Sequence, residues 1–293
     1  MRKVWIEAAL NGGWSRAWQP GIPHTVEAIV NEGIACAKAG ATIIHPHAYD
    51  SDGQHTYDWQ VYARIIEGIR AKVDVPVYPS YPAFTWAGSD DSPYAAPAVR
   101  FAHVEALAVR GLLDFAIIDP GSFNSSQTKT TTKADPVGIY MNPESHVRHA
   151  LDFAKRHGLH PDYAIYEPGF ARAGAALARA AGVKTPIYRL MFCEGLAVGF
   201  PPKPYALAAY HALLEDEARG APWMIAAVNA DLRPLFAETI ARGGHIRGGL
   251  EDAPFGTSAT NLAMVEEAVR IVRENGAEPA TPAEMRRQLA ETA

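Results

Sequence analysis

Cysteine is scarce in this chain: Cys36 and Cys193 are the only two among 293 residues. Two cysteines so far apart form no short metal-binding knuckle and cannot cross-link a chain of this length, which favours a reducing compartment. Long apolar runs are lacking too, because no stretch approaches the roughly 18 uninterrupted apolar residues of a membrane span. The first residues place charges within a short apolar run, unlike a secretory signal. We therefore expect a cytoplasmic protein with no membrane partner.

An excess of basic residues is also absent. Lys and Arg number 27 against 32 Asp and Glu, which gives a net charge of -5 with neutral histidines. This balance argues against a protein that binds nucleic acid through bulk electrostatics. Apolar residues, by contrast, make up 48% of the chain, enough to bury a large core. We expect small-molecule partners, no nucleic acid, and assembly into a homo-oligomer.

Short apolar runs alternate with segments of helical period along the whole chain, a pattern typical of βαβ units and a parallel sheet. Eight strands are predicted, at residues 4–10, 42–47, 75–80, 115–118, 163–166, 187–191, 223–228 and 245–249. The helices that follow them are predicted at residues 25–40, 57–72, 98–109, from 143 onward, 171–181, 204–217, 232–242 and 261–275. A long polar loop is predicted over residues 119–142, and a loop of that length is more often functional than idle.

Eight strand-helix pairs without a Pro/Ser-rich linker favour one closed (β/α)8 barrel, a TIM barrel, with residues 1–293 in a single domain. A two-domain α/β protein is the structural alternative, since a single hydrophobic core stops growing near this chain length. In such a barrel the reactive groups lie at the carboxyl ends of the strands and in the loops that follow. The second and eighth predicted strands have the most polar ends.

The second strand ends in His-Pro-His at residues 45–47. Side chains alternate along a strand, so His45 and His47 share a face and can converge on one metal, about 2 Å from each nitrogen. Alternate barrel strands contribute to the same interior layer, so Glu251, after the eighth strand, can meet them. We predict that these three bind one catalytic divalent metal, zinc, with a position left open for water or substrate. Hydrogen-bonded structural histidines and an ordinary loop acid are the alternative.

Arg247 and Asp252 flank the predicted metal ligand Glu251. One interpretation is structural, with the arginine pairing with Asp252 or holding a neighbouring loop. The other is functional: beside a metal, the pair would anchor a substrate carboxylate or act as a polarised base. The residues alone leave both open.

The chain resembles the β-keto acid cleavage enzymes, a family first described as a domain of unknown function and typified by 3-keto-5-aminohexanoate cleavage enzyme. The resemblance covers nearly the whole chain. Its most specific blocks are the His-Pro-His end of residues 39–47 and the Gly-Gly-His-Ile-Arg-Gly-Gly-Leu-Glu-Asp run at 243–252. Weaker blocks lie at residues 8–12, 121–124 and 280–284.

The resemblance implies a zinc-dependent barrel that cleaves a β-keto acid with acetyl-CoA, giving acetoacetate and a new acyl-CoA. His45, His47 and Glu251 would bind one zinc ion per chain, and acetyl-CoA would be the co-substrate. Arg247 with Asp252 would deprotonate the substrate to its enolate. The residues that match substrate-contacting positions are Ser80, Ser122 and Glu167.

Two segments depart from the family pattern. Where the family has Thr-Gly-x-Glu near the end of the first strand, this chain has Asn-Gly-Gly-Trp at residues 11–14. We expect Asn11 and Trp14 at the substrate, and a less cationic substrate than the amino-keto acid, because the acid that would bind an amine is missing. Residues 79–82 read Pro-Ser-Tyr-Pro in place of a Ser-Thr-Gly-Gly-like turn, which reshapes the pocket at Ser80.

Two other function classes fit the same residues. A metal-dependent barrel aldolase or hydrolase would use the same ligands to activate water and would need no CoA. A binding or sensor protein that keeps the metal and has lost catalysis is the second, and the departures at residues 11–14 and 79–82 favour it. Turnover of a β-keto acid that requires acetyl-CoA separates the cleavage enzyme from both.

Overall fold

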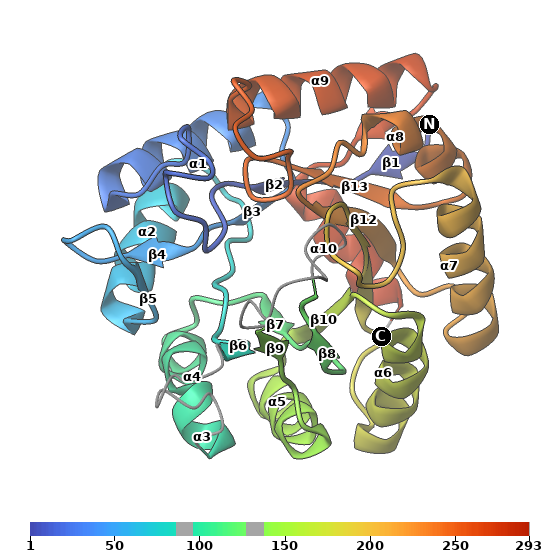
Figure 1. The fold of residues 1–293 in the computed structure, drawn as a ribbon, viewed down its shortest axis with the longest axis horizontal. Helices are drawn as coiled ribbons and strands as arrows, with labels where there is room; N and C mark the ends of the chain where they lie inside the picture. The colour runs from blue at the N-terminus through green and yellow to red at the C-terminus, as the bar shows by residue number, and fades with distance from the viewer. Residues whose placement is uncertain (86–95, 127–137, 293) are drawn as a thin grey trace.

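A curled parallel sheet forms the centre of the fold, with helices around its outside (Figure 1). The structure, a computed structural model, describes residues 1–85, 96–126 and 138–292. Within these residues seven strands pair in the order β3-β2-β13-β12-β11-β10-β7, and every pair is parallel. Their bounds are Ile6–Ala9 (β2), Ile43–His45 (β3), Phe115–Ile117 (β7), His160–Ile165 (β10), Ile187–Cys193 (β11), Trp223–Val228 (β12) and His245–Gly248 (β13).

The eighth position of the barrel is filled by an extended segment instead of a regular strand. Val77 forms one isolated parallel bridge with Ile44 of β3. Prolines at positions 76, 79 and 82 remove backbone donors on both sides of that bridge, so no longer ladder forms. The predicted strand over residues 75–80 is therefore corrected to a single bridged position. The predicted (β/α)8 barrel is confirmed, because strand and helix alternate around one curled parallel sheet.

The helices follow the predicted order. Thr25 caps the first one by accepting from Ala28 N, and Gly40 ends it at φ 120°, as predicted. The helix predicted over residues 98–109 is instead broken at Phe101, whose φ of -98° and ψ of 7° are not helical. The bounds are Val26–Ala39 (α1), Trp59–Arg70 (α2), Pro97–Arg100 (α3), Ala102–Val109 (α4), Glu144–His157 (α5), Pro168–Ala181 (α6), Pro204–Glu217 (α7), Arg233–Ala241 (α8) and Asn261–Glu274 (α9).

Short antiparallel strands extend the carboxyl end of the barrel. One hairpin pairs β4 (Ala48–Tyr49) with β5 (His55–Thr56). A second sheet has the order β6-β9-β8, formed by Phe84–Thr85, Ile139–Tyr140 and Phe123–Asn124 respectively. The predicted loop over residues 119–142 thus contains two short strands, and its residues 127–137 lie outside the described part of the chain.

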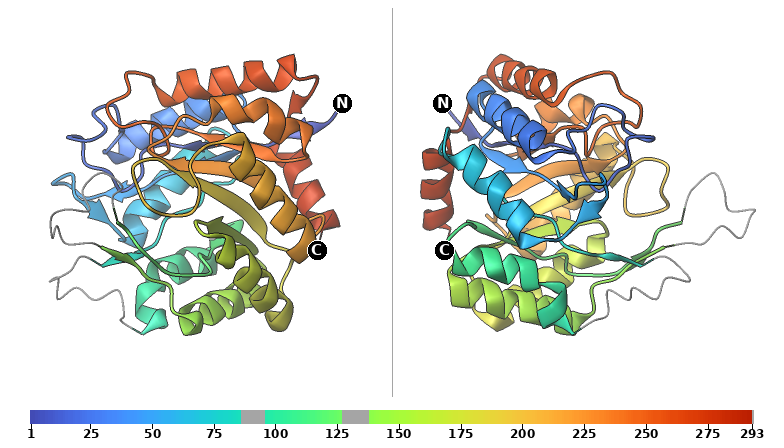
Figure 2. Two further views of the ribbon diagram at one scale, coloured as in Figure 1. Left: turned by 45° about the vertical axis from the view of Figure 1, so that its right-hand side comes forward. Right: turned by 90° about the vertical axis from the view of Figure 1, so that its left-hand side faces the viewer.

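A final helix, α10 (Pro282–Glu291), packs at the opposite end of the barrel from β4 and β5 (Figure 2). It follows β14 (Glu278–Pro279), which pairs in parallel with β1 (Lys3–Val4). Buried Met285 and Leu289 join a core cluster with Trp5, Phe115 and Ile187, which lie at the amino ends of the barrel strands. The sequence reading did not include this helix, although Thr281 and Glu284 form a capping box at its start.

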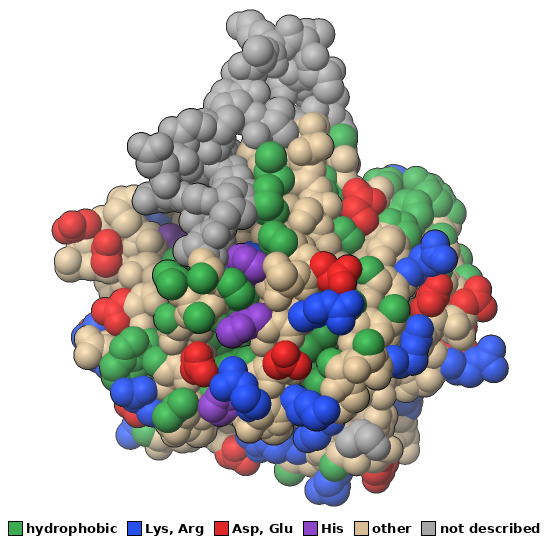
Figure 3. All heavy atoms as spheres, turned by 90° about the horizontal axis from the view of Figure 1, so that it is seen from below, with side chains coloured by type: hydrophobic (Ala, Val, Ile, Leu, Met, Phe, Trp, Pro, Cys, Tyr) green, Lys and Arg blue, Asp and Glu red, His purple; other side chains and the backbone are tan. Residues whose placement is uncertain are grey.

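The surface shows no separation of charge by sign on the face drawn in Figure 3, where basic and acidic side chains lie interspersed. None of the helices in the described residues is long and apolar enough to cross a membrane.

We expect Met285→Ala to lower the free energy of unfolding by about 2–5 kcal/mol, because it leaves a cavity in the packed end of the barrel. The Met285 side chain is fully buried. Denaturant titration followed by circular dichroism measures the change. Val109→Ala is the control, because that side chain is 68% exposed, and it should alter stability by less than about 0.5 kcal/mol. Equal midpoints for the two variants would contradict the role given to α10.

Candidate metal centre and active site

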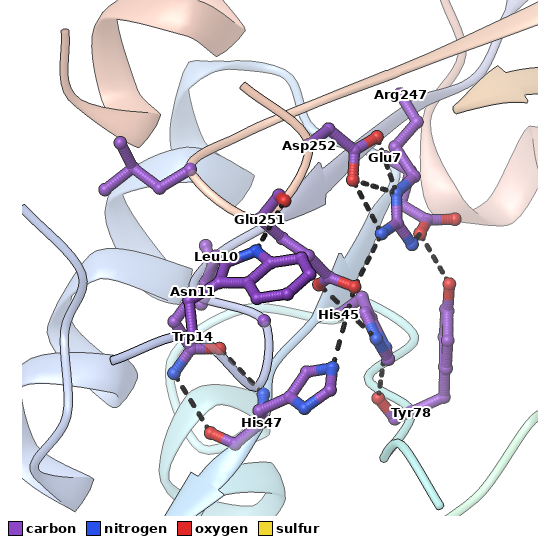
Figure 4. Close-up of polar contacts among 12 residues, drawn as sticks. Glu7, Leu10, Asn11, Trp14, His45, His47, Tyr78, Arg247, Glu251 and Asp252 are labelled. Atoms are coloured by element: carbon purple, nitrogen blue, oxygen red, sulfur yellow. Dashed lines mark hydrogen bonds and ion pairs between the residues drawn. The ribbon is translucent and has the colours of Figure 1, made fainter. Parts of the chain in front are cut away.

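Two histidines and a glutamate converge at the carboxyl end of the sheet (Figure 4). His45 is the last residue of β3, His47 follows two residues later, and Glu251 lies in the loop after β13. The Nε2 atoms of His45 and His47 lie 3.5 Å from Glu251 Oε2 and Oε1 respectively. One ligand atom from each residue lies within 4.8 Å of the others. The structure thus brings together the three residues predicted as metal ligands.

The ring of His45 is oriented by a carbonyl that the sheet leaves free. Its Nδ1 lies 3.1 Å from Tyr78 O, in the extended segment beside β3. Tyr78 donates its own N–H to Ile44 O, and the next bond of a parallel ladder would run from residue 46 to Tyr78 O. Pro46 has no N–H, so that carbonyl accepts from His45 instead. The other ring nitrogen, Nε2, is then the one without a proton and faces Glu251.

The charges at this site suit a divalent cation. Burial lowers the pKa of His45 well below its ordinary value, although Glu251 acts in the opposite direction. Burial acts to raise the pKa of Glu251, but Arg247 and the two histidines outweigh it and hold that pKa well below its ordinary value. Glu251 Oε2 is buried and has no hydrogen-bond partner among the described residues. An unpartnered carboxylate oxygen that faces a neutral imidazole fits a metal with two nitrogen ligands and one oxygen ligand.

His47 is held by its backbone and by its ring. Asn11 accepts from His47 N at 2.7 Å and donates to His47 O at 3.0 Å, so its amide fixes the chain there. His47 Nδ1 lies 2.9 Å from Nε2 of His55, on β5. Burial lowers the pKa of His55 to about 3, with the neighbouring His47 acting in the same direction. Sequence reasoning missed His55, because its place beside His47 depends on the β4–β5 hairpin.

Arg247 is the centre of a buried ion-pair network behind the histidines (Figure 4). It is 2% exposed and donates to two carboxylates, from Nη2 to Asp252 Oδ1 at 2.8 Å and from Nη1 to Glu7 Oε1 at 2.7 Å. It also forms an ion pair with Glu251, whose Oε1 lies 2.9 Å from Nη2. Burial alone would lower the pKa of Arg247, but Asp252, Glu251 and Glu7 raise it well above its ordinary value. The guanidinium therefore stays charged and orients the acids around it.

The barrel interior is charged in the layer beneath the histidines. Glu7 is fully buried on β2 and accepts from Tyr78 Oη at 2.5 Å, while its Oε2 has no hydrogen-bond partner among the described residues. Arg189 on β11 donates to Asp162 on β10 at 3.0 Å, both nearly fully buried. Burial raises the pKa of Asp162 to about 6, although Arg189 opposes it. Glu7 was not identified as a site residue from the sequence, although it stands as a single charged residue inside an apolar strand.

Trp14 lies against Glu251, one of the predicted metal ligands. Its Nε1 donates to the backbone carbonyl of Glu251 at 2.7 Å, and its ring packs edge-on to Phe255 with centroids 5.1 Å apart. Gly12, at φ 62°, makes room for it, since an added Cβ there would lie 2.7–2.8 Å from Trp14 and Glu251. Asn11 uses its amide on the backbone of Pro23 and His47. Substrate contacts by Trp14 and Asn11 stay predictions.

The three remaining substrate predictions lie on neighbouring segments. Ser80 accepts from His103 Nε2 through its backbone carbonyl at 2.8 Å. Ser122 Oγ accepts from Asn142 N at 2.8 Å. Glu167 accepts from the backbone N–H of Gly199 at 2.9 Å and is half-buried. In the described residues these hydrogen bonds lead to helix α4 and to neighbouring loops and not to the predicted metal ligands, so the substrate roles of these residues stay predictions.

We expect Glu251→Gln and His45→Ala each to lose bound divalent metal while the fold is kept, because a catalytic metal is seldom the main stabiliser of a large barrel. Elemental analysis of the purified variants measures the metal, and circular dichroism checks the fold. Glu238→Gln serves as the control, since that acid lies on α8 in an exposed pair with Arg242. A full equivalent of metal in both site variants would overturn the ligand assignment.

Comparison with known structures supports the fold. The apo structure of ObcA superposes with a TM-score of 0.69 at 16% identity over 92% of this chain, which spans 66% of the length of ObcA. Type I 3-dehydroquinate dehydratase from Clostridium difficile gives a TM-score of 0.57 at 10% identity, covering 94% of this chain and 92% of that one. At these identities the likeness concerns the barrel alone.

Comparison with known sequences addresses the family. The 3-keto-5-aminohexanoate cleavage enzyme of Fusobacterium nucleatum is 28% identical, covering 99% of this chain and 98% of the relative. The 3-oxoadipate:acetyl-CoA acetyltransferase of Cupriavidus necator is 26% identical, covering 97% and 93%. The model of the beta-keto acid cleavage enzymes matches residues 3–290. This match over nearly the whole length confirms the family resemblance noted in the sequence: the chain belongs to the β-keto acid cleavage enzyme family.

Proposed function

We propose that this chain cleaves a β-keto acid in a zinc-dependent reaction with acetyl-CoA, giving acetoacetate and an acyl-CoA. The observation that carries the proposal is the cluster of the buried His45 and His47 with Glu251, whose unpartnered Oε2 lies 3.5 Å from His45 Nε2. Family membership supplies the reaction class. The relative from Cupriavidus necator is a 3-oxoadipate:acetyl-CoA acetyltransferase, which supports acetyl-CoA as the co-substrate.

The residues present fit zinc, which takes histidine nitrogens and a carboxylate oxygen as ligands. His45 and His47 would hold it through their Nε2 atoms, and Glu251 through its carboxylate. When bound, zinc supplies Lewis-acid stabilisation of the negative charge that builds on a substrate oxygen.

Asp252 is the residue proposed to take the proton. Burial raises its pKa, partly opposed by Arg247, which makes it a stronger base than an exposed aspartate. Arg247 keeps its charge and holds Asp252 through Nε and Nη2, so it orients the base and does not itself accept the proton. The proton would come from the carbon between the keto and carboxylate groups of the substrate.

The remaining bonds balance without another reagent. The carbanion forms a carbon–carbon bond to the acetyl carbonyl, and the CoA thiolate leaves. The thiolate then adds to the original keto carbon, the older carbon–carbon bond breaks, and acyl-CoA is released. The proton held by Asp252 returns to the carbon of acetoacetate. The net change is an exchange of acyl groups between carbon and sulfur.

Trp14 bears on the choice of substrate. It stands where family members with an amine-binding acid have Glu, and its indole is held beside Glu251. An indole face offers an apolar contact and no negative charge, so we propose a β-keto acid with an uncharged group beyond the keto carbon.

Incubation with a panel of β-keto acids tests the proposal. We expect turnover that requires acetyl-CoA and yields acetoacetate and a new acyl-CoA in equal amounts. Liquid chromatography measures both products. Glu251→Gln is the matched control and should be inactive. Turnover of the same acids without acetyl-CoA would indicate an aldolase or hydrolase instead, and zinc binding without any turnover would indicate a member that has lost catalysis.

Asp252→Asn tests the base. We expect it to keep its metal and to lose about 10²–10⁴-fold in enzyme-dependent deuterium exchange at the substrate carbon, because the amide accepts no proton. Nuclear magnetic resonance in heavy water follows the exchange, with the spontaneous rate subtracted. Wild-type exchange in a variant with full metal content would remove Asp252 from the mechanism.

A further inference from the structure

His47 is contacted at both ring nitrogens, and only one contact comes from a predicted metal ligand. Its Nε2 lies 3.5 Å from Glu251 Oε1, and its Nδ1 lies 2.9 Å from His55 Nε2. A cation between the first pair of atoms needs a lone pair on His47 Nε2. The single proton of the neutral ring must then be on Nδ1, where His55 is the acceptor.

The two histidines of the site thus need the same tautomer but obtain it in different ways. His45 donates from Nδ1 to the backbone carbonyl of Tyr78. Among the described residues, no backbone carbonyl bonds to His47 Nδ1, and the side chain of His55 is its partner instead. Outer partners of this kind fix the ring orientation of a metal-bound histidine. The partner of His47 can therefore be changed by mutation, whereas that of His45 cannot.

The fold positions His55 for this contact. Residues Tyr49 and His55 are paired across the β4–β5 hairpin, whose first strand, β4, follows directly on His47. The turn between them is closed by Asp50, whose carboxylate accepts from the N–H groups of Asp52 and Gln54. The His55 ring also packs against Tyr57, with centroids 4.7 Å apart. The ring is thus held by the hairpin independently of any metal.

We propose that His55 is a positioning residue, which sets the tautomer and the ring orientation of His47 for metal binding. It has no assigned role in cleavage and acts through His47. The inference rests on the metal assignment in the proposed function.

Metal affinity without substrate tests it. Competition with a chromophoric chelator measures zinc binding, and the visible spectrum of the cobalt-substituted protein reports the ligand geometry. We expect His55→Phe, which keeps a ring in the hairpin, to bind zinc about 10–100-fold more weakly and to change the cobalt spectrum. His55→Gln should restore most of the affinity, because its amide oxygen reaches about as far as Nε2 and accepts a hydrogen bond.

His103→Phe is the matched control, because it removes another buried histidine nearby, one that bonds to Ser80 O and not to a ligand. It should leave zinc affinity and the cobalt spectrum unchanged. Wild-type affinity in His55→Phe, or equal losses in the Phe and Gln variants, would overturn the role of His55 and leave the proposed function standing. A wild-type chain that takes up no zinc would overturn both.

Discussion

The ion pairs of Arg247 are the interaction on which the rest of the site depends. Three carboxylates surround this one guanidinium, those of the buried Glu7 and Asp252 and of the partly buried Glu251. A buried carboxylate is costly unless its charge is balanced, and one arginine balances only one of the three. If all are ionised, two negative charges remain, and a divalent cation beside Glu251 would cancel them. The same network that holds the proposed base therefore also favours a divalent cation beside Glu251.

Part of this site was predictable from the sequence. His45 and His47 share a face because side chains alternate along a strand, and Glu251 follows the eighth predicted strand, which is even-numbered like the second. Short-range periodicity was therefore enough to predict that the three residues meet. Glu7 is different. It is the register partner of Arg247 in the pairing of β2 with β13, 240 positions apart in the sequence. No local pattern specifies such a pairing, so Glu7 looked like an isolated charge in an apolar strand.

The fold shows the same division. Strands and helices of clear period were predicted to within a few residues, because burial on one face repeats along each element. The break at Phe101, the helix α10 and the β4–β5 hairpin were missed. Of these, α10 packs against residues from distant strands, whereas the hairpin is a local turn whose two-residue strands are too short to show a period. His55 belongs to this group: only the hairpin reveals that it faces His47.

The segment at residues 75–80, predicted as the third strand, connects fold and function most directly. Proline cannot donate to a ladder, so the segment around Val77 keeps a single bridge to β3. Pro46 likewise leaves Tyr78 O without its ladder donor, and His45 takes that acceptor. Because Pro46 donates nothing to Tyr78 O, the His45 ring meets no competing backbone donor at that carbonyl. The proline between the two histidines thus does more than space them: it removes one backbone donor from the barrel, and the carbonyl left free orients His45, a predicted metal ligand. At His47 the hairpin supplies through a side chain what the interrupted strand supplies through its backbone.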